Sequence, residues 1–335
     1  MSLGIRTVRL GDTEVETTVL GFGCADLFRE PSRAQRRQLL DVALDAGIRH
    51  FDVAPMYGLG LVERELGRFA RGKRDRIVIA TKFGIAPTLG ARLLGRAQGP
   101  AGRLFGAVPA LRERARPTAA DPRSGAIGAL LYRSGGFDRQ GAAASLERSL
   151  RALRTDYVDV LLLHDPAPGD VRSDDVRGYL ESASAAGRIR AWGVAGDPGP
   201  TLEVARGLTP PIPILQVRGD VFQRSLRDIR DVAQATIVFG VIGRALPRIL
   251  AHVRSDDGTR RRWSDAVGAD CGLPDEVAAL LLRNALRAND RGVVLFGTIQ
   301  AERIEAAATA TRLPEPALDS FGELISEELG MGAEP

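Results

Sequence analysis

The chain has 335 residues, of which 44% are hydrophobic and 26% charged, a composition that can form a large core and excludes a disordered protein. Its formal net charge of +4 is small for this length and argues against a general nucleic-acid binder. Two cysteines, Cys24 and Cys271, are too few for a disulfide framework or a metal cluster, which is typical of a reducing compartment.

The N-terminal residues form no apolar signal segment, and no run of about 18 apolar residues follows them. We therefore expect a cytoplasmic protein that contacts no membrane and holds no metal. The first predicted element is a short β-hairpin over 6–16, with Gly11 and Asp12 as its turn.

Short apolar segments then alternate with helical patterns along the chain. The predicted strands are 18–23, 50–54, 76–83, 157–164, 191–196, 214–217, 235–242 and 293–297. Apolar residues at three- and four-residue spacing predict helices over 32–46, 61–71, 139–153, 174–186 and 274–288. Ser32 and Asp138 are placed to act as N-caps of two of these helices.

Eight strands alternating with helices are typical of a (β/α)8 barrel, and the continuous apolar run 158–163 suits a parallel sheet covered on both faces. An open doubly wound sheet is the alternative. The first strand, however, leads into Gly-Phe-Gly-Cys-Ala-Asp at 21–26, which is not the GxGxxG fingerprint of that fold. We therefore predict an α/β fold, a TIM barrel forming one domain over 1–335, with an N-terminal hairpin and a long insertion after the third strand.

The insertion spans 85–137 and carries eight arginines against Glu113 and Asp121. Loops after barrel strands usually have about two to six residues, so a loop of this length is either functional or a surface feature. One hypothesis is a basic lid that closes over the substrate and favours an acidic group. The alternative is a surface loop without function.

Four polar residues lie at or just beyond the carboxyl ends of predicted strands, where a barrel of this type builds its active site. These are Asp52, Tyr57, Lys82 and His164. Lys82 is one of only two lysines in the chain and ends an apolar strand, so it needs a buried partner, which Asp52 can supply. The ammonium would lower the pKa of a neighbouring tyrosine, and His164 could donate a hydrogen bond to a substrate oxygen. The alternative is a purely structural salt bridge in the barrel mouth.

These residues and their surroundings resemble the aldo-keto reductase family. The matching segments are 20–23, 51–58, 63–67, 80–84 and 156–164. The ending His164-Asp165-Pro166 looks most like the bacterial branch of galactose- and fucose-type aldose dehydrogenases. The resemblance implies an NAD(P)H-dependent oxidoreductase that interconverts a carbonyl and an alcohol of a small molecule by hydride transfer, with Tyr57 as general acid and base.

The resemblance also implies an extended cofactor site over the barrel mouth. Gln216 would contact the nicotinamide carboxamide, and Gly23, Gly297 and Thr298 would lie along the cofactor. Arg303 fits a 2′-phosphate and favours NADPH, with NADH as the alternative.

The chain departs from the family pattern at several places. The family commonly has Gly-Val-Ser-Asn at the end of the fifth strand, whereas residues 193–196 read Gly-Val-Ala-Gly and lack both hydrogen-bonding side chains. Residues 243–273 also depart from it. Two rival functions therefore stay open: a non-catalytic sensor that binds the cofactor, and a lyase or isomerase that uses Tyr57 and His164 for proton transfer alone.

Overall fold

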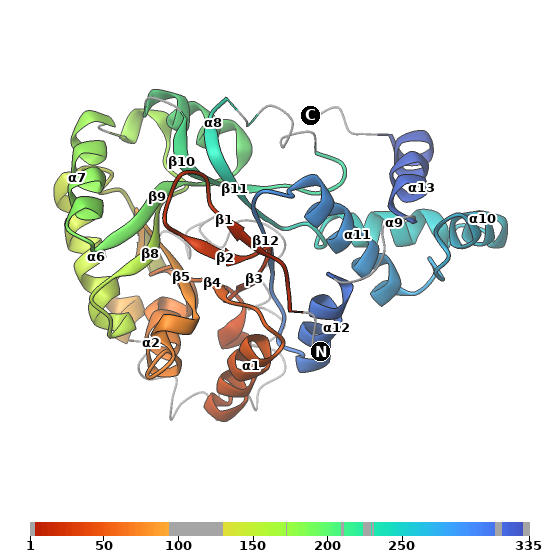
Figure 1. Ribbon diagram of the computed structural model, residues 1–335, viewed down its shortest axis with the longest axis horizontal. Helices are drawn as coiled ribbons and strands as arrows, with labels where there is room; N and C mark the ends of the chain where they lie inside the picture. Colours follow the sequence, from red (N-terminus) through yellow and green to blue (C-terminus); the bar gives the residue numbers. More distant parts are fainter. Residues whose placement is uncertain are drawn as a thin grey trace.

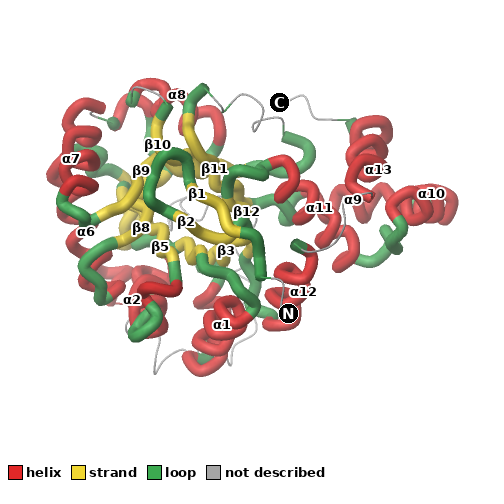
Figure 2. Tube along the Cα trace, viewed as in Figure 1, coloured by secondary structure: helices red, strands yellow, loops and turns green. Residues whose placement is uncertain are grey.

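The computed structural model describes residues 4–93, 130–171, 173–208, 211–223, 229, 231–311 and 317–330. Eight parallel strands form a closed barrel, which confirms the predicted (β/α)8 architecture (Figures 1 and 2). In their order around the barrel the strands are β3 (Leu20–Gly23), β4 (His50–Asp52), β5 (Val78–Phe83), β8 (Val158–His164), β9 (Ile189–Gly196), β10 (Ile212–Arg218), β11 (Ala233–Phe239) and β12 (Val293–Phe296). Each of the eight strands expected from the sequence is present.

Helices surround the barrel (Figure 2). They are α1 (Arg33–Asp45), α2 (Val62–Phe69), α6 (Arg139–Leu153), α7 (Ser173–Ala185), α8 (Pro198–Gly207), α11 (Pro274–Ala288) and α12 (Ala301–Ala310), with short helical turns η1 (Leu27–Arg29), η2 (Tyr57–Gly60), η3 (Arg74–Arg76) and η4 (Pro168–Asp170) between them. Both predicted N-caps are confirmed: Ser32 accepts a hydrogen bond from the Gln35 backbone N–H at 3.4 Å and Asp138 from that of Gly141 at 2.7 Å. These side chains satisfy donors that the helix itself leaves unpaired.

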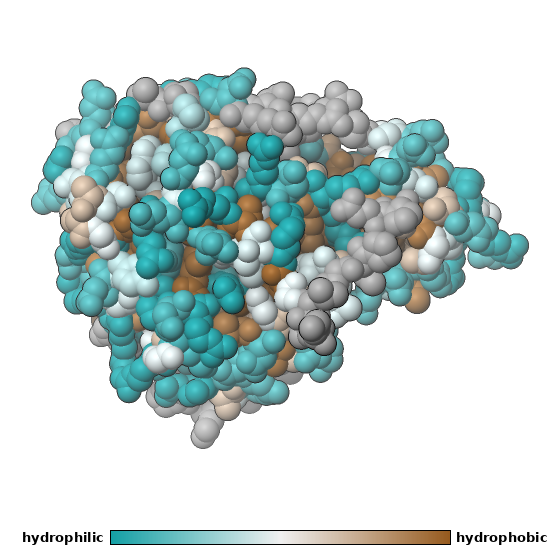
Figure 3. Space-filling model, in the orientation of Figure 1, coloured by the Kyte–Doolittle hydropathy of each residue, from teal (hydrophilic) through white to brown (hydrophobic). Residues whose placement is uncertain are grey.

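The predicted hairpin is also present, as β1 (Thr7–Arg9) paired antiparallel with β2 (Glu16–Thr18). It lies across one end of the barrel (Figure 1). Leu10 and Val15 are buried from this hairpin and pack with inward-facing barrel residues such as Val78 and Val160. The hairpin therefore closes the amino-terminal end of the barrel and leaves the opposite end for a site. On the face that carries the hairpin, polar side chains predominate at the surface, with apolar ones visible between them (Figure 3).

The two ends of the predicted insertion are tied together beside the active-site strand. β6 (Ile85–Pro87) pairs antiparallel with β7 (Tyr132–Ser134), and the Gly135 N–H donates to the Gly84 carbonyl at 2.8 Å. Gly84 has a φ of 108°, and a side chain there would collide with the ring of Phe137. Residues 94–129, which include most of the hypothesised lid, lie outside the described residues.

A second apolar cluster forms beside the barrel from α9 (Ala245–Val253), α10 (Asp257–Val267), α11, α13 (Ala317–Leu324) and the π-helical turn η5 (Ile325–Leu329). Residues 243–273, which depart from the sequence pattern, thus contain two helices. Their core is centred on Trp263, which is fully buried and meets the ring of Phe321 at 6.2 Å with the planes nearly perpendicular. In the described part of the chain, no helix is long and apolar enough to cross a membrane.

Glu328 holds the end of this second cluster in place. Its carboxylate contacts His252 at 2.8 Å and accepts hydrogen bonds from Arg262 at 2.7 Å and from the Trp263 indole at 3.1 Å. The hydrogen bonds from Arg262, together with those from His252 and Trp263, lower the pKa of Glu328 to about 2 against the opposing effect of burial.

We expect Glu328→Gln to lower the free energy of unfolding by about 1 kcal/mol at neutral pH, since charged hydrogen bonds are lost at a partly exposed position. Because the folded pKa is depressed, the stabilisation is complete above the usual glutamate pKa of about 4.3 and is lost as the pH falls toward 2. Urea unfolding at both ends of this range measures the difference. The exposed Glu181→Gln change, which breaks only the Arg177 pair, serves as control. Equal unfolding midpoints for Glu328→Gln and wild type at neutral pH would show that the Glu328 carboxylate does not stabilise the fold.

Candidate active site

A buried ion pair lies at the carboxyl end of the barrel. The Lys82 Nζ on β5 donates to both carboxylate oxygens of Asp52 on β4, at 2.7 and 2.8 Å, and to the Val53 carbonyl at 3.1 Å. Both side chains are almost fully buried. All three protons of the ammonium therefore have acceptors. Burial opposes the charge of Lys82, but the neighbouring Asp52 carboxylate and Tyr57 outweigh it and raise the pKa of Lys82.

Tyr57 is held above this pair by a turn of unusual backbone. Three successive residues after it, Gly58, Leu59 and Gly60, have φ values of 54°, 55° and 85°. Leu59 is the only one of the three with a side chain, and a left-handed conformation costs such a residue about 1 kcal/mol or more. The turn places the Lys82 Nζ 5.2 Å from the centre of the Tyr57 ring.

Burial raises the pKa of Tyr57 to about 12, although the charge of Lys82 acts to lower it. The expectation that Lys82 brings this pKa below its ordinary value is therefore wrong in its net direction. The ammonium acts as expected, but the loss of water around the hydroxyl is the larger effect. Tyr57 consequently holds its proton at neutral pH.

His164 completes the group at the end of β8. Its ring lies 6.1 Å from that of Tyr57, with the two planes at 89°. The structure thus brings together all four side chains expected at the site, from β4, β5, β8 and η2. A proton donor, a cation that can stabilise its conjugate base and an imidazole that can contact a substrate oxygen share one end of the barrel.

Asp165 is a residue of this site that sequence reasoning missed. It follows His164 with a φ of 45°, and its carboxylate lies 4.0 Å from the His164 Nε2. A side chain at Gly196 would collide with Asp165 and with Thr201. The carboxylate therefore occupies space next to the β9 end, where the usual serine and asparagine are absent. The signal in the sequence was a charged residue directly after a strand end and before Pro166.

Gln216 on β10 joins the site from the far side. Its Nε2 donates to Asp52 at 3.1 Å, while its Oε1 is buried and has no hydrogen-bond partner among the described residues. An acceptor without a partner is costly in a buried place, so this oxygen suits a ligand with an N–H donor. A primary carboxamide such as that of nicotinamide is such a group.

The other expected cofactor residues lie along the neighbouring strand ends. Gly23 ends β3, and a side chain at Gly297 would approach the Gly23 carbonyl to 3.0 Å. The Thr298 hydroxyl accepts a hydrogen bond from the Gln300 N–H at 3.2 Å, just before α12. Arg303 is half exposed on α12, with its guanidinium 3.7 Å from Asp275. Backbone N–H groups and a half-exposed guanidinium at a helix start suit a phosphate.

Comparison with known proteins finds a matching family model and proteins of similar sequence. The sequence model described as the Aldo/keto reductase family matches residues 19–246. D-threo-aldose 1-dehydrogenase of a Pseudomonas species is 35% identical over 181 residues, which cover 52% of this chain and 49% of that protein. Pyridoxal 4-dehydrogenase of Microbacterium luteolum is 47% identical over 78 residues, 22% of this chain and 23% of that protein. The matches thus span about half, or less, of the length of these relatives.

Solved structures match over nearly the whole chain. An aldo-keto reductase from Bacillus halodurans in its holo form has a TM-score of 0.68 at 20% identity, covering 96% of both chains. The glycerol dehydrogenase of Gluconobacter oxydans has a TM-score of 0.69 at 16% identity, covering 98% of both. At these identities the likeness concerns the fold.

The ion pair allows a test of the site that needs no substrate. Removing one partner of a buried pair leaves an uncompensated charge, so we expect Lys82→Met to lower the free energy of unfolding by about 3–5 kcal/mol. The double change Lys82→Met with Asp52→Leu removes both charges and should recover part of this loss. Urea unfolding of both proteins measures the coupling. If Lys82→Met is as stable as wild type, or the double change is no more stable than the single one, the ion pair does not contribute this amount to the free energy of unfolding.

Proposed function

The chain belongs to the aldo/keto reductase family, and on that premise we propose that it is a nicotinamide-dependent oxidoreductase that interconverts a carbonyl and an alcohol. The observation that carries the proposal is the placement of Tyr57 beside both a buried ammonium and His164. This arrangement supplies a proton to an oxygen and then stabilises the tyrosinate that results. Among the described residues, the site contains no side chain placed as an activated nucleophile, which argues against covalent catalysis.

We propose the following roles for the protein's own groups in reduction. The nicotinamide, when bound, supplies the hydride. Tyr57 donates its hydroxyl proton to the carbonyl oxygen as negative charge develops there, and Lys82 stabilises the phenolate that is left. Asp52 holds Lys82 in position through its two hydrogen bonds. His164 orients the carbonyl by a hydrogen bond from its ring. In oxidation the Tyr57 phenolate accepts the proton of the alcohol hydroxyl.

For the cofactor we propose that Gln216 accepts a hydrogen bond from the carboxamide through its partnerless Oε1. Gly23 and Gly297 leave room for the extended molecule, and Thr298 and the start of α12 receive its phosphates. NADPH is proposed over NADH because Arg303 suits a 2′-phosphate. Arg303 lies 3.7 Å from the Asp275 carboxylate and must leave it to bind that phosphate.

For the substrate we propose a small hydroxylated carbonyl compound of the aldose type. Two observations support it: the 35% identity with D-threo-aldose 1-dehydrogenase, and the Asp165 carboxylate beside His164, which can accept hydrogen bonds from hydroxyl groups. The preference for an acidic substrate was predicted from the insertion, most of which lies outside the described residues, and it stays a prediction. A cytoplasmic location is proposed on the two buried, free cysteines.

We expect Tyr57→Phe to lower kcat for aldose or aldehyde reduction at least about 100-fold, because general acid catalysis contributes that much or more. NADPH affinity, followed by fluorescence titration, should change little. Tyr179→Phe is the matched control, since this buried tyrosine lies on α7 outside the site. Undiminished turnover in Tyr57→Phe would refute its role, and absence of NADPH binding in the wild type would favour a lyase or isomerase.

The raised pKa of Tyr57 predicts opposite pH dependences for the two directions. Reduction needs the phenol, so its kcat should stay constant between about pH 6 and about pH 9. Oxidation needs the phenolate, whose fraction rises about tenfold per pH unit below the pKa. The oxidation rate should therefore increase through the alkaline range without reaching a plateau before about pH 10. A plateau near neutral pH would show that the tyrosine titrates far below 12.

A further inference from the structure

A cavity lies in the groove between α2 and α6. Its volume is about 430 Å³, within the range of small-molecule sites. One end is bounded by Pro55, Leu59 and Gly60 from the loop that carries Tyr57, and by Pro87 from β6. Six arginines line the remainder: Arg64, Arg68, Arg92, Arg148, Arg151 and Arg154.

The described lining residues provide little negative charge to balance these arginines. Glu63 is the acidic residue among the described lining residues, and its buried carboxylate already accepts a hydrogen bond from Thr81 at 2.8 Å. Arg151 contacts Glu147 at 3.4 Å and Arg68 contacts Glu65 at 3.3 Å, but neither glutamate lines the cavity.

Three further arginines of the cavity are less well compensated. Within the residues that the structure describes, Arg64, Arg148 and Arg154 form no ion pair. Burial, with the charges of Arg92 and other arginines, lowers the pKa of Arg148. Cations that repel one another at a half-buried site are stabilised by an anion from outside.

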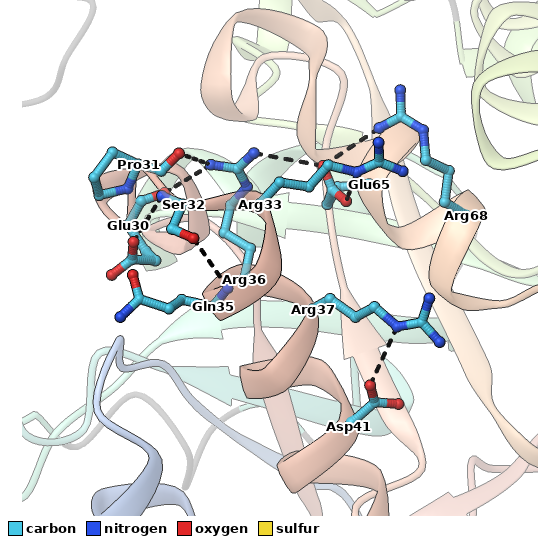
Figure 4. A network of polar contacts seen from close by, with 10 residues as sticks. All are labelled: Glu30, Pro31, Ser32, Arg33, Gln35, Arg36, Arg37, Asp41, Glu65 and Arg68. Carbon is cyan, nitrogen blue, oxygen red and sulfur yellow. Dashed lines mark hydrogen bonds and ion pairs between the residues drawn. The ribbon is translucent and has the colours of Figure 1, made fainter. Parts of the chain in front are cut away.

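The neighbouring groove between α1 and α2 shows how the chain compensates arginines when it does so itself. There Arg33, Arg36 and Arg68 converge on the buried carboxylate of Glu65, at 3.5, 3.6 and 3.3 Å (Figure 4). One carboxylate at the centre serves three guanidinium groups. In the cavity between α2 and α6 the one carboxylate among the described lining residues is that of Glu63, which interacts electrostatically with Arg148 and Arg92 and is outnumbered by six guanidinium groups.

We propose that this cavity binds a small molecule that carries at least two phosphate groups. Arg64 and Arg68 are one helical turn apart on α2, and Arg148 and Arg151 are nearly so on α6. Arginines thus line the cavity from both walls. Arg64 on one wall and Arg148 on the other form no ion pair among the described residues, and a guanidinium matches a phosphate in bidentate geometry. A single phosphate would engage only part of this wall.

The position of the cavity separates it from the proposed cofactor site. Its lining residues belong to α2, α6 and the loops that follow β4 and β5, whereas Gln216, Gly297 and Arg303 belong to β10, the β12 end and α12. Leu59 and Gly60, which follow Tyr57 in the same turn, line it, so a ligand in the cavity would contact the strained turn that carries this tyrosine.

Isothermal titration with inorganic pyrophosphate and with orthophosphate at low salt tests the proposal. We expect the wild-type protein to bind pyrophosphate at least about tenfold more tightly than orthophosphate, because two phosphates engage both walls. The double change Arg64→Gln with Arg148→Gln should weaken pyrophosphate binding at least about 30-fold. Ala152→Glu, which places a carboxylate on the cavity wall, should weaken it comparably while leaving every arginine in place.

Two controls distinguish binding in this cavity from general charge attraction and from binding at the barrel mouth. Arg177→Gln with Arg260→Gln removes the same charge from exposed helix positions on α7 and α10 and should leave pyrophosphate binding within about twofold of wild type. Arg303→Gln should do the same, because it alters only the barrel mouth. An equal loss of pyrophosphate affinity in the first control would show that the anion is bound by general charge attraction. A comparable loss in Arg303→Gln would show that the anion binds at the barrel mouth. Either result, or no preference for pyrophosphate, would overturn the proposal.

Discussion

The buried pair of Lys82 and Asp52 is the interaction on which the rest of the site depends. Removing an ammonium and a carboxylate from water costs several kcal/mol for each ion, so the pair persists only where every proton and lone pair is used. The barrel meets this condition through its register. Asp52 pairs with Ala80, and Lys82, two residues later, shares the inward face of β5 with Ala80. The ammonium therefore meets both carboxylate oxygens, and the Gln216 amide from the opposite wall supplies the next hydrogen bond.

Loss of water also explains the behaviour of Tyr57, whose side chain is partly buried. A charge nearby and the loss of water act on its hydroxyl in opposite directions, and here the loss of water is the larger effect on its pKa. A tyrosine that keeps its proton in the resting site is suited to give it away only when charge develops on a bound oxygen. Lys82 then contributes most after the proton has moved, since it stabilises the phenolate and has little influence on the phenol.

Local patterns in the sequence were enough to predict the strands, the two N-caps and the four residues at the barrel mouth. They succeed because strand ends in a parallel barrel converge, whatever the helices between them do. The position of Asp165, the second helical cluster around Trp263 and the arginine-lined cavity could not be predicted in this way. Each arises where segments far apart in the chain pack together, and the net pKa of Tyr57 likewise depends on burial that no local pattern expresses.

The two lysines of this arginine-rich chain illustrate what scarcity can and cannot indicate. Lys73, in a polar turn, donates to Asp41 at 2.6 Å and lies 4.2 Å from the centre of the Phe69 ring, so it also makes specific contacts. Its side chain is 23% exposed, however, against 2% for Lys82. An ammonium in contact with water can exchange one partner for another at little cost, whereas a buried one must keep the partners it has. Rarity draws attention to both residues, and only the difference in burial separates a surface contact from a charge around which a site is built.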